Sequence, residues 1–94
     1  MNKKFIGMLG LARKARKVIL GYDNIVQRQK SVILLIMSES AVERTKKNVE
    51  ALNKPIIVVD MNKAELGYVL GAGEVSVVAV IDDGIAKQLT ETAK

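Results

Sequence analysis

The sequence predicts an α/β domain built as a three-layer α-β-α sandwich. Four short runs of apolar residues, rich in β-branched side chains, occur along the 94 residues. Each run is too short for a typical helix and suits a strand that is buried on both faces. Between the runs, apolar residues recur at helical spacing behind capping residues. No repeat or linker interrupts this alternation, so we expect one domain over residues 1–94.

The first predicted helix covers residues 3–14, with Asn2 as its N-cap. Gly7 and Gly10 lie three residues apart and share a face of this helix, where each costs about 1 kcal/mol relative to alanine. We expect them to permit close packing, either on the sheet or on a ligand, with the sheet favoured. The buried stripe of the helix is predicted to consist of Phe5, Met8, Leu9 and Ala12.

The segment KVIL, residues 17–20, predicts a short strand that ends at Gly21. A second helix is expected to open at Tyr22 or Asp23 and to continue to about residue 29, with Ile25 and Val26 facing inward. The next segment, residues 32–37, holds six consecutive apolar residues. This segment predicts a central strand.

Ser40 and Glu43 have the Ser-x-x-Glu spacing of a capping box and predict the start of the third helix. Asn53 and Pro55 are expected to end it, because the residue before proline disfavours the helical conformation. The inner face of this helix is predicted to carry Val42, Val49 and Leu52.

The last third of the chain repeats the same alternation. IIVV, residues 56–59, predicts another buried strand, and Asn62 with Glu65 predicts a second capping box. The fourth helix carries Leu66, Val69 and Leu70 and is expected to end at Gly71 in a left-handed turn. Residues 76–81 predict the last strand, and Asp82 or Asp83 is expected to cap a final helix that runs to about Thr92.

Cysteine and histidine are both absent from the chain. Their absence excludes disulfides, thiolate nucleophiles, Cys/His zinc sites and the usual proton shuttle near neutral pH. No clustered Asp/Glu motif suggests a metal site, so we expect neither a cofactor nor enzymatic activity. No apolar run reaches the roughly 18–20 residues that span a bilayer, and the N-terminal segment lacks the apolar centre of a signal peptide. We therefore expect a cytoplasmic protein without membrane contact.

The positive charge is concentrated at the beginning of the chain. Residues 1–30 hold eight basic side chains and one acidic side chain, whereas residues 31–94 hold seven basic and nine acidic ones. A local positive field attracts polyanions, and nucleic acid is the commonest of these in cytoplasm. A solvated surface that confers solubility is the alternative interpretation. The basic residues predicted to contact RNA are Arg13, Lys14, Arg16, Lys17 and Arg28.

Two glycine-containing segments are candidates for close contact with a ligand. Gly21 lies at a predicted helix start, where a missing side chain lets a large ligand approach the backbone. Tyr22 beside it is expected either to stack on a base or to pack on the core. In LGAGEVSVV, residues 70–78, the Gly-x-Gly follows a helix and precedes a strand, which is the wrong order for a phosphate loop. We expect a flexible loop instead, with freedom from Gly71 and Gly73 and a small apolar tip of Ala72 and Val75. The alternative is that Val75 starts the last strand and points into the core.

Three stretches together resemble the bacterial relatives of ribosomal protein L-seven-Ae, which share a fold with ribosomal protein L-thirty-e. They are LGLARKARKVILGYDNIV, VILLIMSESAVERTKKNVEALNKPIIVV and NKAELGYVLGAGEVSVVAVIDDGIAKQL, which cover nearly the whole chain, with ELGYVLG the most specific block. The resemblance implies a four-stranded mixed sheet between helices. It also implies binding to kink-turn RNA, a bent helix–internal loop–helix. In that family a loop before the last strand covers a flipped base.

The family reads the kink-turn with a Gly-x-Asn-Glu-x-x-Lys motif at the start of the second helix. Only the glycine, Gly21, is retained here. Asp23, Asn24 and Gln27 stand at the asparagine, glutamate and lysine positions. Asp23 accepts but cannot donate a hydrogen bond, and Gln27 lacks the charge that pairs with phosphate. Arg16 also stands where the bacterial relatives usually have glycine.

The sequence thus predicts a small, monomeric, non-enzymatic protein that binds ribosomal RNA or another structured RNA and associates with the ribosome or another ribonucleoprotein. Its contact face is expected to combine Gly21–Gln27 with the loop 71–75. The alternative is a protein-interaction module on the same fold that has lost kink-turn recognition.

Overall fold

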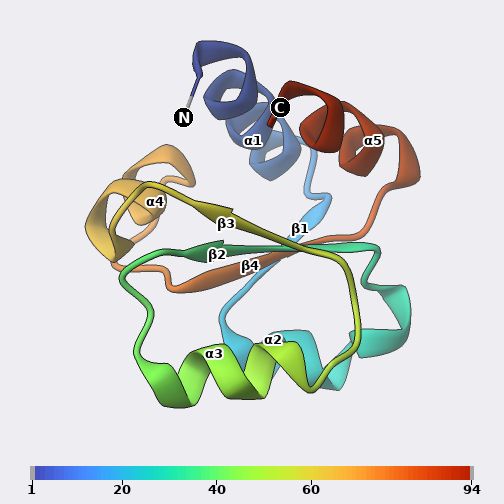
Figure 1. The fold of residues 1–94 in the computed structure, drawn as a ribbon. Coiled ribbons are helices and arrows are strands. Elements are labelled where there is room, and N and C mark those ends of the chain that lie inside the picture. Colours follow the sequence, from blue (N-terminus) through green and yellow to red (C-terminus); the bar gives the residue numbers. More distant parts are fainter. Residues whose placement is uncertain (1, 94) are drawn as a thin grey trace.

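A computed structural model describes residues 2–93, and it places a sheet between two layers of helices (Figure 1). α1, α4 and α5 cover one face of the sheet, and α2 and α3 cover the other. This arrangement confirms the predicted α-β-α sandwich. The elements are α1 (Lys3–Lys14), β1 (Val18–Leu20), α2 (Tyr22–Gln27), a 3₁₀ turn (Gln29–Ser31), β2 (Leu34–Ser38), α3 (Glu43–Glu50), β3 (Ile56–Val59), α4 (Lys63–Val69), β4 (Val77–Val80) and α5 (Asp83–Thr92).

The four-stranded sheet has the order β1-β4-β2-β3 and is mixed. β4 pairs antiparallel with both β1 and β2, so that Ala79 lies opposite Ile19 and Val78 lies opposite Ile36. β2 pairs parallel with β3, with Ile36 opposite Ile57. β1 and β3 are therefore the edge strands.

The central strand β2 contributes to both halves of the core, as its continuous apolar sequence predicts. Leu34 and Ile36 pack beneath α1, α4 and α5, whereas Leu35 and Met37 pack against α2 and α3. Successive side chains of a strand point to opposite faces, so an all-apolar strand suits a sheet covered on both sides.

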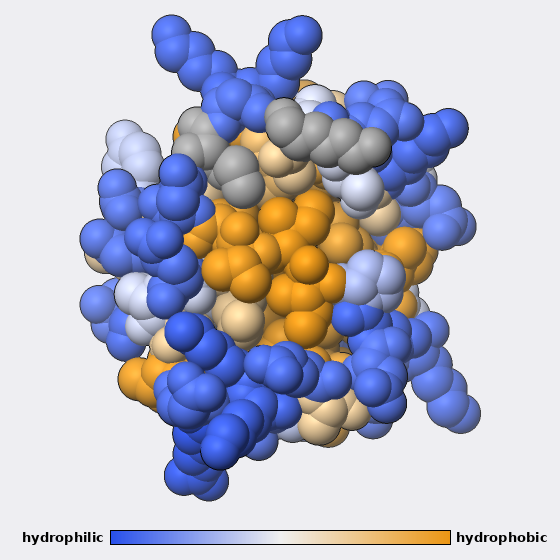
Figure 2. All heavy atoms as spheres, viewed as in Figure 1, coloured by the Kyte–Doolittle hydropathy of each residue, from blue (hydrophilic) through white to orange (hydrophobic). Residues whose placement is uncertain are grey.

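The prediction that β3 is buried on both faces is wrong, because this strand lies at the edge of the sheet. Val58 is 54% exposed, and Ile56 and Ile57 are only half-buried. Figure 2 shows apolar side chains gathered in the middle of the face on which β3 lies in front, with hydrophilic side chains around them.

Three of the predicted helix caps are present in the structure. The Asn2 side chain accepts a hydrogen bond from the Phe5 N–H at 2.8 Å, and the Asp82 side chain accepts one from the Ile85 N–H at 2.9 Å. Asn62 and Glu65 form the predicted capping box of α4. These local signals therefore located the starts of α1, α4 and α5 correctly.

The capping box predicted for α3 is wrong. α3 begins after Val42, which makes no side-chain capping bond and is 58% exposed rather than on the inner face. Ser40 is engaged elsewhere: its hydroxyl pairs with that of the buried Ser38 at 2.9 Å and accepts a hydrogen bond from the Lys63 N–H at 3.1 Å. The residue expected to start α3 thus connects the end of β2 to the start of α4.

Candidate nucleic-acid interface

The two segments that the sequence singled out meet at one surface hollow of about 390 Å³. Gly21 and Tyr22 line it from the first segment, and Ala72 and Val75 line it from the second. The pairing of β1 with β4 causes this meeting, since the Gly21 N–H donates to the Val77 carbonyl at 3.3 Å. The hollow is completed by Leu20, Thr45, Glu74, Ser76 and Val77.

Gly21 is required by its backbone conformation, with φ 85° and ψ 142°. Residues with a Cβ atom rarely adopt this region. Space does not demand a glycine, because the nearest atom that an added Cβ would meet is the Asn24 Nδ2, 4.0 Å away. The Asn24 amide also donates to the Leu20 carbonyl at 3.0 Å and so holds the turn from β1 into α2.

The polar residues of the altered motif lie on the outside of α2. Asp23, Asn24 and Gln27 are exposed, while Ile25 is fully buried and packs α2 against the sheet. Tyr22 is half-buried against the core beneath α2, yet it also lines the hollow. Tyr22 thus packs partly on the core, and its stacking on a base stays a prediction.

The loop 71–75 is anchored at both ends, which contrasts with the flexible loop expected from its glycines. The Ala72 N–H donates to the Gly67 carbonyl at 2.8 Å, and the Val75 N–H donates to the Lys63 carbonyl at 3.1 Å. Gly71 has the predicted left-handed conformation, with φ 65°, but Gly73 does not have a positive φ. The loop is thus held against α4 by backbone hydrogen bonds near both of its ends.

The prediction that Val75 forms an exposed apolar tip is wrong. Val75 is 6% exposed and belongs to the core beneath α1, α4 and α5, although its edge still borders the hollow. Ala72 is exposed and is the apolar residue that the loop offers to a ligand. The carboxylate side chain of Glu74, which the sequence did not single out, also lines the hollow.

The predicted basic residues are spread along the molecule rather than gathered at the hollow. The Arg13 Nε donates to the Leu70 carbonyl at 3.2 Å, which holds Arg13 beside Gly71. Lys17 precedes β1 and its carbonyl accepts from the Ile81 N–H at 2.9 Å, so it lies at the opposite end of β1 from Gly21. A three-residue strand is about 10 Å long. Arg28 likewise follows the last residue of α2, about one helix length, roughly 10 Å, from Gly21.

The five basic side chains predicted to contact RNA, Arg13, Lys14, Arg16, Lys17 and Arg28, are all exposed. Within residues 2–93 none of them forms an ion pair with a carboxylate. No carboxylate of residues 2–93 therefore pairs with these charges, and such exposed cations attract an anionic partner. The negative charges of Asp23 and Glu74 lie close to the hollow and reduce the positive potential there.

Sequence reasoning missed Thr45, which belongs to α3 and reaches the hollow only through tertiary packing. It assigned no role to Tyr68, one of only three aromatic residues in the sequence, whose side chain is 86% exposed in the structure. Among residues 2–93 no helix is both long and apolar enough to cross a bilayer. In the same range no cluster of carboxylates with metal-binding geometry is found.

None of the protein-family models compared with the chain matches it, and none of the curated proteins does. A solved structure of a protein with unknown function from Bacillus halodurans C is similar to it, with a TM-score of 0.86 and 31% sequence identity. The similarity covers 98% of this chain and 98% of the Bacillus halodurans chain. The α-β-α fold and its connections are thus common to both proteins over their full compared length. At this identity and coverage, the chain belongs to the same protein family as the Bacillus halodurans protein.

Proposed function

We propose that the protein is a non-enzymatic RNA-binding protein of the cytoplasm that binds ribosomal RNA or another structured RNA as a monomer. The observation that carries the proposal is the meeting of Gly21–Tyr22 and the 71–75 loop at one hollow. Its volume of about 390 Å³ lies in the range of small-ligand sites, about 300–1,000 Å³. Unstacked bases in RNA loops and bulges are recognised in such concave surfaces beside aromatic side chains.

The basic residues support an extended anionic ligand rather than a small one. Arg13 lies beside the loop, and Lys17 lies at the far end of β1. Unpaired cations over such a length can contact several phosphates of one nucleic acid strand and thereby supply most of the affinity, whereas the hollow supplies selectivity. Kink-turn RNA is the class to test first, since it places an unstacked base beside a bent duplex.

The second candidate is a protein-interaction module, and the two carboxylates near the hollow favour it. Asp23 is exposed at the start of α2, and Glu74 lines the hollow itself. Carboxylates repel phosphate and attract basic side chains, so a protein with a basic segment would suit this part of the surface. RNA is favoured by the exposed basic side chains, because they extend along the molecule well beyond the hollow.

The proposal is tested by the salt dependence of binding to a kink-turn RNA hairpin. If about four phosphates are neutralised, the logarithm of the affinity should fall with the logarithm of the salt concentration with a slope of roughly −3 to −4. Replacing Arg13, Lys14, Arg16 and Lys17 together by alanine should flatten this slope. Fluorescence anisotropy over a salt series gives both quantities.

A matched control replaces Lys47, Lys54, Lys63 and Lys87 by alanine and removes the same total charge from other surfaces. This control should retain most of the slope if position matters and should match the first variant if only net charge matters. An equal loss in both variants, or no binding of the parent protein to RNA, contradicts the proposal. Melting curves verify that each variant is folded.

A further inference from the structure

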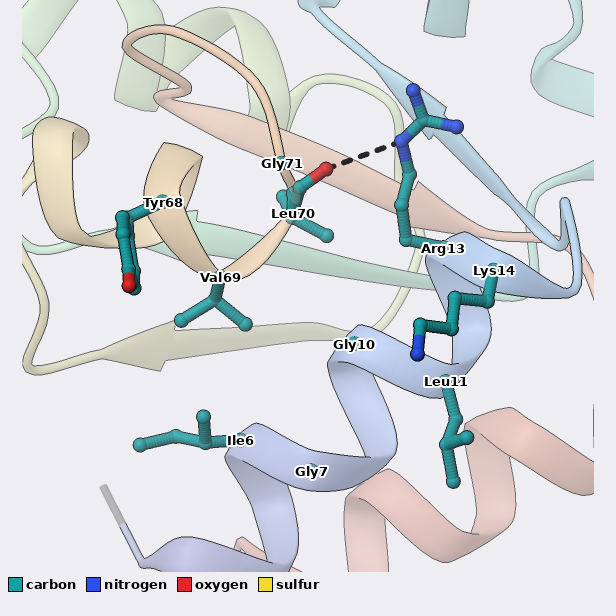
Figure 3. Close-up of a pocket in the computed structure, with 10 residues that line it drawn as sticks. All are labelled: Ile6, Gly7, Gly10, Leu11, Arg13, Lys14, Tyr68, Val69, Leu70 and Gly71. Atoms are coloured by element: carbon teal, nitrogen blue, oxygen red, sulfur yellow. Dashed lines mark hydrogen bonds between the residues drawn. The ribbon is translucent and has the colours of Figure 1, made fainter.

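A second concave surface lies between α1 and α4, on the other side of the 71–75 loop from the hollow at Gly21. This groove has a volume of about 420 Å³. It is lined by Ile6 and Leu11 of α1 and by Tyr68 and Val69 of α4. In Figure 3, Ile6 and Val69 point toward one another across the gap, whereas Leu11 points away from α4. Tyr68 is 86% exposed and Leu11 is 58% exposed, so the groove is apolar but open to solvent.

The base of the groove contains Gly7 and Gly10, and neither glycine is required by packing. An added Cβ at Gly7 would meet no atom within 4 Å, and one at Gly10 would meet only the Val69 carbonyl oxygen at 3.9 Å. The expectation that these glycines permit close packing on the sheet is therefore wrong. The space above them belongs to the groove, and a larger side chain would fill it.

One end of the groove is positively charged. Arg13 and Lys14 line it, and in Figure 3 the Lys14 side chain extends along α1 toward Gly10. The Arg13 Nε donates to the Leu70 carbonyl at 3.2 Å, which fixes the guanidinium in place and leaves its two Nη groups without a protein acceptor within residues 2–93. No carboxylate lines this groove. Its charge is thus complementary to phosphate.

The exposed ring of Tyr68 lies at one end of this groove and the two cations lie at the other (Figure 3), an arrangement suited to single-stranded RNA. Every base can stack on an aromatic face, and a neighbouring cation can hold the phosphate. The groove also continues the proposed interface, because Gly71 lines the groove and the next residue, Ala72, lines the hollow at Gly21. A single strand that leaves the hollow therefore meets the groove after passing over the loop.

We propose that the groove between α1 and α4 binds an unpaired nucleotide of the RNA, with its base on Tyr68 and its phosphate held by Arg13 and Lys14. This inference rests on the proposed RNA-binding function and adds a second contact, for single-stranded RNA that flanks the structured element. Selectivity for RNAs with such a flanking strand follows from it.

The test compares three probes: a blunt-ended kink-turn hairpin, the same hairpin with ten unpaired uridines at its 5′ end, and the same hairpin with ten unpaired uridines at its 3′ end. Fluorescence anisotropy measures the affinity for each probe. One extension should raise the affinity of the parent protein about tenfold, the scale of one base stacked on an aromatic ring. Tyr68→Ala and Gly10→Leu should each abolish this gain and leave affinity for the blunt hairpin unchanged. Tyr68→Phe should retain the gain because it keeps the ring.

Val42→Ala is the matched control, since it removes an exposed apolar side chain just before α3, on the other helical layer, and should retain the gain. If the parent binds the extended and blunt hairpins equally, or if Tyr68→Ala and Gly10→Leu keep the gain, the groove proposal is overturned while the proposed function stands. If the parent binds no probe, both are overturned. In a further outcome, a second protein co-purifies with the parent after ribonuclease treatment and is lost from Tyr68→Ala, while the affinity gain from the extension is unchanged. The groove is then a protein site and the proposal is overturned.

Discussion

Gly73 packs its backbone directly against Gly67 of α4. A Cβ atom at position 67 would lie 1.5 Å from the Gly73 carbonyl oxygen and 2.7 Å from its carbonyl carbon. The Ala72 N–H also donates to the Gly67 carbonyl at 2.8 Å, so the loop folds back over the last turn of α4. This contact explains the first glycine of ELGYVLG, since the loop can take this position only if residue 67 has no side chain.

Gly67→Ala is expected to displace the loop and to lower stability. The added methyl group collides with backbone atoms that cannot rotate away, and overpacking of this kind costs roughly 1–3 kcal/mol. For a domain of this size the melting temperature should fall by roughly 5–20 °C. Affinity for the kink-turn hairpin should fall as well, because Ala72 moves with the loop. Differential scanning calorimetry and anisotropy measure the two effects.

Gly7→Ala is the control for that variant, because no atom lies within 4 Å of the added Cβ. It should leave the melting temperature unchanged or raise the stability by up to about 1 kcal/mol, the difference in helix propensity. Equal melting temperatures for Gly67→Ala and Gly7→Ala would show that the contact with Gly73 does not hold the loop.

Val75 and Ala72 are expected to respond differently to the same substitution. Val75→Asp places a carboxylate in the core and loses the burial of a valine, worth about 1.5–3 kcal/mol, so it should lower the melting temperature strongly. Ala72→Asp changes an exposed position and should alter stability by no more than about 0.5 kcal/mol. Its negative charge should nevertheless weaken RNA binding about tenfold, since it lies where a base or phosphate would contact the loop.

Melting curves and RNA affinities for both Asp variants distinguish these roles. A Val75→Asp protein that melts like its parent would show that the side chain is not part of the core. Unchanged affinity in Ala72→Asp would remove the loop from the interface.

Arg16 has a left-handed backbone conformation, with φ 60°, where glycine is favoured. It ends α1 in a turn in which the Arg16 N–H donates to the Arg13 carbonyl and the Lys17 N–H donates to the Ala12 carbonyl. Residues with a Cβ atom pay about 1–2 kcal/mol for this conformation. Arg16→Gly should therefore be more stable than Arg16→Ala by about 1 kcal/mol, a difference of roughly 4–8 °C in melting temperature.

Both Arg16 variants lose the same charge, so they should weaken RNA binding equally. A smaller loss of affinity in one of them would indicate that the turn itself, and not only the guanidinium, contributes to binding. Identical melting temperatures would contradict the strain assigned to Arg16.

The triple variant Asp23→Asn, Asn24→Glu and Gln27→Lys restores the motif of the family that the sequence resembles. All three side chains are exposed, so the core should be unaffected. Loss of the hydrogen bond from Asn24 to the Leu20 carbonyl should cost no more than about 1 kcal/mol. We expect tighter binding to a kink-turn hairpin relative to a plain duplex of the same length, measured by competition. A variant that discriminates no better than the parent would show that these residues do not limit recognition.

The sequence by itself determined the elements and most of their boundaries. Capping by Asn2, Asn62 and Asp82 is local, because each side chain bonds to a backbone N–H three residues later, and such contacts can be read from spacing. The continuous apolar runs of β2 and β4 determined that helices must cover both faces of the sheet. The concentration of positive charge before residue 31 is likewise a property of the sequence alone.

The tertiary structure decided which of these residues lie together. Ser40 matched a local capping pattern, but its hydroxyl bonds to the Lys63 N–H, 23 residues away, because the end of β2 lies beside the start of α4. Val58 was predicted to be buried, yet it lies on an edge strand, and strand order depends on long-range pairing that periodicity does not encode. For the same reason, only the structure shows that Gly73 packs on Gly67 and that a groove lies above Gly7 and Gly10. The structure also decided that Val75 lies in the core.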